Sequence, residues 1–273
     1  MGKSESLVAR ARYVAGRAKH HAERMLATAG LRQSETRIAA DSQSFWARPA
    51  GPWWEDQSHW RDGPTFGTGD LWLRLDRDHL AVVQRGARAV GWEWRQPRIV
   101  DWGCGGGANA VHLAPLASEF VGGDVAEETL AECRRQVAQV CDTPFTSVLV
   151  EVNDPESAAG MITPCDLFVS FYVFELIPTP EYGERLLRIA AEALVPGGLA
   201  VIQIKYSDGT WRTRSFRRSY RSRFAEMTTY DLEEFWKLAA KCGLTPQLMT
   251  LVPRNELDRR YAYFVLSKPH VAA

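Results

Sequence analysis

The stretch "RIVDWGCGGGANA", residues 98–110, decides the fold. An apolar run ends at Asp101, and four glycines follow within residues 103–107, directly before a segment with helical character. Because glycine has no Cβ, such positions allow unusual φ angles and let a ligand approach the main-chain amides closely. The stretch therefore predicts a strand that ends at a ligand-binding turn.

Strand and helix patterns alternate from this point to the end of the chain. Five strands are predicted over residues 98–103, 119–125, 145–152, 165–173 and 198–206, and two more over 247–252 and 261–267. Helices are predicted over residues 108–116, 126–140 and about 180–194, and between a capping segment at 228–231 and Gly243. This order predicts a doubly wound α/β domain with a mostly parallel seven-stranded sheet and a C-terminal antiparallel hairpin.

The glycine turn by itself fits two cofactors. "GCGGGA" satisfies the dinucleotide pattern G-x-G-x-x-A, and Asp124 stands about 20 residues further on, where an acid that binds a ribose would be. A nicotinamide-dependent reductase is therefore one alternative.

Three features distinguish between the two: Asp101 ends the strand two residues before the first glycine, the glycine turn comes after nearly 100 residues of chain, and a β-hairpin is predicted at the end. The chain resembles the class I S-adenosylmethionine-dependent methyltransferases over roughly residues 95–268. Their first motif, D-x-G-x-G-x-G, is present as Asp101, Gly103, Gly105 and Gly107. Their second-strand acid matches Asp124, their fourth strand matches "CDLFVSFYVFELIP", and their turn before the fifth strand matches "LVPGGLAVIQI". The resemblance implies a Rossmann-like fold with S-adenosyl-L-methionine as cofactor.

The resemblance also implies which residues hold this cofactor. The glycines would admit its methionine part, Asp101 would lie near its ammonium group, and Asp124 would accept hydrogen bonds from both ribose hydroxyls. Asn153 or Asp154 matches the position that contacts the adenine amino group. The full set is Asp101, Gly103, Cys104, Gly105, Asp124, Val125, Asn153, Asp154, Ser170 and Phe171.

The catalytic base is the main departure from the family. Many members that act on small molecules carry a histidine where Leu176 stands here, so that base is not carried over. The remaining candidates are Tyr172, His59 and Asp208. A non-catalytic cofactor-binding subunit is a further alternative, because no base is evident.

Two unusual segments are candidates for the acceptor site. Residues 41–66 contain four of the ten tryptophans, and "TWRTRSFRRSYRSR", residues 210–223, contains six arginines and no acid. We expect them to converge over one cleft, with Trp53, Trp54, Arg217 and Arg218 binding the acceptor. The alternatives are tryptophans that only fix the loop to the core and arginines on a solvated face.

The predicted organisation is an N-terminal helical and Trp-rich extension, residues 1–94, and a methyltransferase domain, residues 95–268, with an Arg-rich insertion at about 207–227. Residues 5–30 have a helical period and a basic face formed by Arg10, Arg17, Lys19 and Arg24. Such a helix could contact an anionic membrane surface peripherally. It could instead pack on its own domain or on a second subunit of a homo-oligomer, and its Ala- and Val-rich apolar face favours packing.

Composition narrows the remaining function classes. Lys and Arg balance Asp and Glu at 33 each, which argues against a nucleic-acid track. The first residues lack the apolar core that a secretory signal has, and no apolar run reaches the roughly 18 residues that a membrane span needs. The five cysteines are scattered and do not have the spacing of zinc ligands. These features predict a cytoplasmic protein that binds no metal.

The predicted activity is methyl transfer to a hydroxyl of a small-molecule, sugar or glycolipid acceptor. The acceptor would be anionic if the arginines bind it. The alternative is an RNA or protein methyltransferase.

Overall fold

The computed structural model describes residues 18, 21–23, 25–27, 29–47, 51–67, 71–162, 164–220, 224–252 and 259–270. The four basic residues of the predicted N-terminal helix face, Arg10, Arg17, Lys19 and Arg24, lie outside the described residues, as do Arg221 and Arg223. Within the described part of the chain, no helix is both long enough and apolar enough to cross a membrane.

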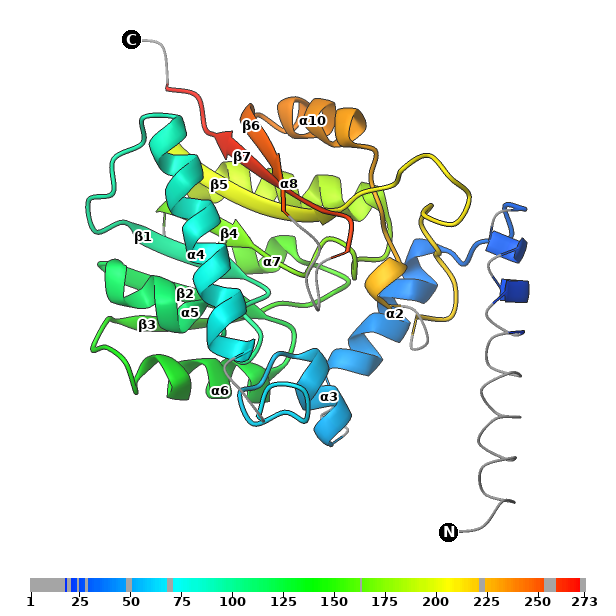
Figure 1. Ribbon diagram of the computed structural model, residues 1–273, viewed down its shortest axis with the longest axis horizontal. Helices are drawn as coiled ribbons and strands as arrows, with labels where there is room; N and C mark the ends of the chain where they lie inside the picture. Colours follow the sequence, from blue (N-terminus) through cyan, green and yellow to red (C-terminus); the bar gives the residue numbers. More distant parts are fainter. Residues whose placement is uncertain are drawn as a thin grey trace.

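A seven-stranded sheet forms the centre of the molecule, in the order β3-β2-β1-β4-β5-β7-β6 (Figure 1). The strands are β1 (Arg98–Trp102), β2 (Glu119–Asp124), β3 (Phe145–Leu149), β4 (Cys165–Ser170), β5 (Leu194–Lys205), β6 (Thr245–Leu251) and β7 (Tyr261–Ser267). The first five are parallel, and β7 runs antiparallel between β5 and β6. The predicted doubly wound sheet with its C-terminal antiparallel hairpin is confirmed.

Helices cover both faces of this sheet. One face carries α4 (Leu71–Ala89), α5 (Ala110–Leu113) and α6 (Glu127–Val137); the other carries α7 (Glu156–Ala159), α8 (Pro180–Ala193) and α10 (Leu232–Lys241). Side chains alternate between the two faces along each strand, so Ile99 packs into the cluster under α4 and Val100 into the cluster under α8. Because both faces of the sheet are covered by helices, its strands have nearly continuous apolar sequences, as β1 does.

The helix after β1 is shorter than the sequence predicts. Instead of one helix over residues 108–116, α5 has four residues and continues as a 3₁₀ turn, η1 (Ala114–Leu116). Pro115 lies inside the predicted segment and has no N–H to donate, so the α-helical hydrogen-bond ladder ends there. The other helix ends are predicted more closely: Asp231 caps α10 by accepting from the Glu233 and Glu234 amides, and Gly243 follows with a φ of 88°.

The N-terminal extension folds into α2 (Glu35–Trp46) and α3 (Pro52–Gln57), which lie at the carboxyl ends of the parallel strands. Trp46 and Trp54 of these helices pack with Phe216 and Tyr220, so the extension and the Arg-rich insertion meet in one apolar cluster. In contrast, α4 precedes residue 95 but packs on the sheet beside β7, so it is part of the layered domain.

Close packing of α4 on the sheet makes a stability prediction. A Cβ built on Gly86 would lie 2.6 Å from Val265 Cγ2, and Val265 is fully buried in β7. Replacing Gly86 with Leu should therefore lower the free energy of unfolding by about 1–3 kcal/mol, as overpacking does. Urea unfolding measures this. Gly160→Ala is the control, because nothing lies within 4 Å of its Cβ position, and this variant should unfold like the wild type. Equal stability of both variants would contradict the tight α4–β7 contact.

Candidate active site

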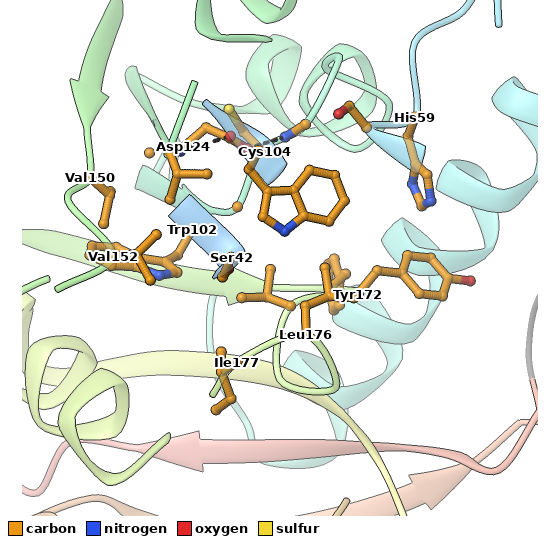
Figure 2. Close-up of a pocket in the computed structure, with 18 of the residues that line it drawn as sticks. Ser42, His59, Trp102, Cys104, Asp124, Val150, Val152, Tyr172, Leu176 and Ile177 are labelled. Atoms are coloured by element: carbon orange, nitrogen blue, oxygen red, sulfur yellow. Dashed lines mark hydrogen bonds between the residues drawn. The ribbon is translucent and has the colours of Figure 1, made fainter. Parts of the chain in front are cut away.

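An elongated pocket lies where β1, β2 and β4 end. Its empty space amounts to about 920 Å³, part of which is open to solvent. Figure 2 shows Val150 and Val152 at one end, His59 and Tyr172 at the other, and Asp124 along one side. Ligands of doubly wound sheets bind in this crevice, beyond the carboxyl ends of the strands.

The glycine turn forms one wall of the pocket. Gly103, Gly105 and Gly107 have φ angles of 79°, 53° and 90°, a left-handed conformation that side chains with a Cβ rarely adopt. The Gly103 amide donates to the Gly123 carbonyl at 2.7 Å and ties the turn to β2. A Cβ on Gly103 would also collide with Val173.

The turn is approached closely by another part of the same chain. The Gly106 amide donates to the Ser58 carbonyl at 2.7 Å, and a Cβ on Gly105 would lie 2.8 Å from that oxygen. A Cβ on Gly106 would lie 2.8 Å from the carbonyl oxygen of His59, which also accepts from Trp72 Nε1 at 2.7 Å. The sequence predicts close approach by a ligand; the structure shows that the residues after α3 use part of this space.

Asp124, the last residue of β2, holds the glycine turn in place. Its carboxylate accepts the Gly105 amide at 3.0 Å and the Val125 amide at 2.8 Å, one on each oxygen. Burial raises the pKa of Asp124 to about 6, while these backbone donors act in the opposite direction. A carboxylate has about four lone-pair sites, and the Gly105, Val125 and Ala126 amides do not fill all of them, so Asp124 can accept a hydroxyl from a ligand.

Asp101 is the most unusual carboxyl group in this region. It is fully buried at the middle of the sheet, and neither of its side-chain oxygens has a hydrogen-bond partner among the described residues. Burial, with a smaller contribution from the charge of Asp124, raises the pKa of Asp101 to about 8. A buried carboxyl without a partner is costly, and it fits a site that is completed by a cationic ligand.

Aromatic side chains form the other end of the pocket. His59 and Tyr172 lie with ring centroids 5.0 Å apart, and both have left-handed φ angles, of 54° and 56°. The Tyr172 amide is held by Gln203 Oε1 at 2.6 Å. The ring of His79, in α4, lies 5.3 Å from that of Tyr172. Burial first, and then the nearby His79, lower the pKa of His59 to about 4. His59 is therefore neutral at neutral pH and can accept a proton.

Eight of the predicted site residues line this pocket: Gly103, Cys104, Gly105, Asp124, Val125, Phe171, Tyr172 and His59. Asp101 and Ser170 lie just beneath it; both are fully buried, and Ser170 Oγ donates to the Trp102 carbonyl at 3.0 Å. The remaining predicted residues do not line the pocket.

Asp208 is placed differently from the prediction. It lies in an exposed turn, where Oδ1 accepts the Thr210 amide at 3.0 Å and the Thr213 hydroxyl at 2.5 Å. These hydrogen bonds, with that of the Thr210 hydroxyl, lower the pKa of Asp208 to about 2. Asp208 stabilises its own turn and is not positioned to take a proton from a molecule in the pocket.

Asn153 and Asp154 are exposed in the turn after β3, outside the pocket lining. The pocket end near them is formed by Val150 and Val152 together with Ser42 of α2. Ser42 was not predicted, because it takes part in the site only through the packing of α2 against the sheet.

The Trp-rich residues 41–66 and the Arg-rich insertion do meet at the pocket, but not through Trp53, Trp54, Arg217 and Arg218. Trp54 is fully buried and donates to the Phe45 carbonyl at 3.1 Å, while Trp53 is 52% exposed. Arg218 donates to Glu23 at 2.7 Å, and neither it nor Arg217 lines the pocket.

Besides Ser42, Gln57, Ser58 and His59, these two segments bring Trp46 and Tyr220 to the pocket, joined by a 2.7 Å hydrogen bond from Trp46 Nε1 to the tyrosine hydroxyl. Their aromatic character is visible in the sequence, but the face that each presents is set by tertiary packing.

Comparisons with known proteins agree with this geometry. Residues 100–200 match the family model of a methyltransferase domain. The chain is 23% identical over 238 residues to a ubiquinone biosynthesis O-methyltransferase of Nitrosococcus oceani, covering 84% of this chain and 92% of that protein.

Two solved structures show the same fold. The Burkholderia thailandensis 1,6-didemethyltoxoflavin-N1-methyltransferase, with bound 1,6-didemethyltoxoflavin and S-adenosylhomocysteine, has a TM-score of 0.59 and 17% identity, over 87% of this chain and 91% of that one. Magnesium protoporphyrin IX methyltransferase from Synechocystis PCC 6803, with bound S-adenosylmethionine, also has a TM-score of 0.59, with 12% identity over 85% and 97% of the two chains.

The raised pKa of Asp101 predicts a pH-dependent stability. A carboxyl whose pKa is higher in the folded than in the unfolded state favours folding at low pH, and this contribution is lost as the pH rises through about 8. Asp124, with a pKa of about 6, and His59, with a pKa lowered from 6.5 to about 4, affect the slope only below pH 6.5. The free energy of unfolding should therefore fall between pH 6.5 and 8, by at most about 1.4 kcal/mol per pH unit from Asp101. Asp101→Asn should remove this slope in urea unfolding, and Asp208→Asn should keep it. An unchanged slope in Asp101→Asn would show that another group is responsible.

Proposed function

We propose that this chain, of which residues 100–200 match a methyltransferase domain, is an S-adenosylmethionine-dependent methyltransferase that methylates a hydroxyl of a small, uncharged and largely apolar acceptor. The cofactor, when bound, supplies a sulfonium whose methyl carbon is electrophilic. The protein's part is to hold the two molecules in line and to remove the hydroxyl proton.

The residues of the pocket fit this cofactor. The unpartnered carboxyl of Asp101 would complement its ammonium group, and the open lone pairs of Asp124 would accept the ribose hydroxyls. The apolar end at Val150 and Val152 suits a nucleobase. The nicotinamide cofactor that the glycine pattern also allowed is set aside, because the matching family model and both solved neighbours are methyltransferases.

His59 carries the proposal for the acceptor end. It lines the pocket beside Tyr172, with the two ring centroids 5.0 Å apart, so an acceptor bound at this end would lie next to the imidazole. The pKa of about 4 makes His59 a weaker base than free histidine, so the place of the ring and not its basicity supports this role. A neutral imidazole in this place can accept the proton that the acceptor hydroxyl loses. The histidine that the family carries after the fourth strand is absent here, and His59 would supply the same chemistry from the N-terminal extension.

The lining of the pocket supports an uncharged acceptor. Among the described residues, its ionisable lining includes Asp124 and His59 but no Lys or Arg. Trp46, Leu176 and Tyr220 contribute apolar and ring surface, which suits a planar molecule. An anionic or highly hydroxylated sugar acceptor would lack charged partners here, because the described arginines of the insertion lie outside the pocket.

Oxygen is proposed over nitrogen because the relative that matches most of the chain is an O-methyltransferase, while one solved neighbour is an N-methyltransferase. The test is direct. Calorimetry should show binding of S-adenosylmethionine and S-adenosylhomocysteine but not of NADH. With methyl-labelled cofactor, a panel of phenols and catechols should gain label that mass spectrometry locates on oxygen. Matched anilines, benzoates and sugars should gain little. Label on the anilines alone would overturn the oxygen proposal and leave methyl transfer intact.

The role of His59 gives a separate prediction. His59→Gln should lower kcat by about 10²–10⁴-fold, the usual contribution of a general base, without changing the affinity for S-adenosylhomocysteine. His112→Gln is the control, because His112 lies on α5 outside the pocket lining, with Nε2 3.2 Å from the Leu73 carbonyl oxygen. Turnover with an acceptor from the panel measures both. A His59→Gln enzyme with wild-type kcat would show that another group removes the proton.

A further inference from the structure

Helix α2 forms a wall of the pocket although it belongs to the N-terminal extension. Ser42 and Trp46 of this helix line the pocket beside Val152. Ala39, on the same helix, is buried in the apolar cluster that contains Val152 and Tyr182. The shape of the pocket near Val150 and Val152 therefore depends on where α2 rests.

One polar contact fixes the middle of α2. The backbone amide of Val152 donates to Gln43 Oε1 at 2.9 Å. This contact ties the helix to the chain that follows β3, at the pocket end opposite His59 and Tyr172.

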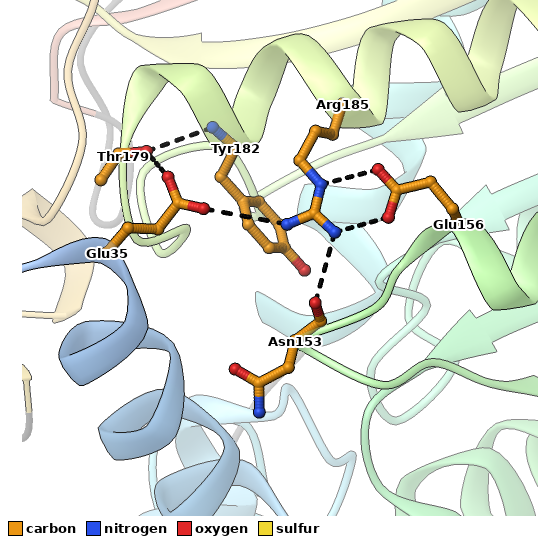
Figure 3. Close-up of polar contacts among 6 residues, drawn as sticks. All are labelled: Glu35, Asn153, Glu156, Thr179, Tyr182 and Arg185. Carbon is orange, nitrogen blue, oxygen red and sulfur yellow. Dashed lines mark hydrogen bonds and ion pairs between the residues drawn. The ribbon is translucent and has the colours of Figure 1, made fainter.

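A second group of contacts fixes the start of α2. The Thr179 hydroxyl donates to Glu35 Oε2 at 2.5 Å, and Arg185 Nη1 lies 3.8 Å from Glu35 Oε1. Thr179 also caps α8 by accepting the Tyr182 amide. Figure 3 shows Glu35 reaching from α2 toward both residues of the α8 segment.

Arg185 connects this contact to the rest of the pocket end. Its Nε and Nη2 donate to the two carboxylate oxygens of Glu156 at 2.6 and 2.5 Å, and Nη2 also donates to the Asn153 carbonyl at 3.3 Å. The guanidinium lies 5.1 Å from the ring centroid of Tyr182, which lines the pocket. One planar, forked cation thus contacts α2, α7, the loop after β3 and a pocket-lining ring.

We propose that Arg185 is a positioning residue for cofactor binding, which holds α2 against the Val150–Val152 end of the pocket so that Ser42 and Trp46 complete the site for the nucleoside. The proposal rests on the cofactor assignment above but not on the identity of the acceptor. It goes beyond the family motifs, because neither α2 nor Arg185 is part of them.

A purely stabilising ion pair is the competing interpretation. Arg185 is partly exposed, and most exposed ion pairs contribute little. The two interpretations differ in what they predict for cofactor affinity. If Arg185 positions α2 through Glu35, removing either side chain should weaken cofactor binding, and the two losses should not add.

The experiment is a double-mutant cycle on S-adenosylhomocysteine affinity, measured by calorimetry, with thermal unfolding recorded in parallel. The variants are Arg185→Gln, Glu35→Gln and the double variant; Glu35→Gln keeps an oxygen for Thr179 but removes the charge. Arg188→Gln is the matched control, because Arg188 lies on the same helix and pairs with Glu184 at 2.8 Å, away from the pocket. Arg185→Lys tests whether the planar fork is needed.

We expect Arg185→Gln and Glu35→Gln each to weaken binding about fivefold, or about 1 kcal/mol, and the double variant to be no weaker than Arg185→Gln. Arg188→Gln should bind as the wild type does, and Arg185→Lys should recover only part of the loss. Additive losses, unchanged affinity in Glu35→Gln or an equal loss in Arg188→Gln would overturn the proposal. A wild-type protein that does not bind S-adenosylhomocysteine would instead refute the cofactor assignment itself.

Discussion

The hydrogen bond between the Gly106 amide and the Ser58 carbonyl joins the N-terminal extension to the turn that follows β1. It requires a backbone without Cβ atoms at Gly105 and Gly106, because a side chain at either position would lie 2.8 Å from a carbonyl oxygen of the extension. The residues after α3 are held at this place, and His59 therefore points toward Tyr172 at the far end of the pocket. Together with the hydrogen bond from Trp72 Nε1 to the His59 carbonyl, this contact sets the place of the imidazole in the pocket.

The two ends of the pocket are built from different kinds of contact. One end is formed by the aromatic rings of His59 and Tyr172, and the backbone amide of Tyr172 is fixed by Gln203. The opposite end is apolar inside and held from outside by charged side chains around Arg185. Because the walls are mostly apolar, a bound ligand would be oriented by the few polar side chains in the lining, such as Asp124 and His59. This division explains why charge is scarce in the lining although the chain is rich in arginine.

Much of the fold could be predicted because its signals are local. Apolar strands, the Asp231 cap and the glycine turn depend on neighbours in sequence, and the position of Asp124 follows from the end of a strand. The acceptor side could not be predicted in the same way. Trp46 and Trp54 belong to one aromatic segment, yet the packing of α2 and α3 turns Trp46 toward the pocket and buries Trp54 in a cluster. The sequence makes Asp208 a candidate base, but its carboxylate accepts hydrogen bonds from the hydroxyls of Thr210 and Thr213 in its own turn. His79 and Ser42 carry no sequence signal at all, since only tertiary contacts bring them to the site.

The hydrogen bond between Trp46 and Tyr220 joins residues 174 positions apart in the chain. Contacts of such separation form late, because the loop between them must close before the contact is made. During synthesis, the tryptophans of the extension emerge well before the segment that covers them, and their apolar rings stay exposed until residues 216–220 arrive. The pocket wall formed by Trp46 and Tyr220 therefore cannot be complete before residue 220 has been synthesised.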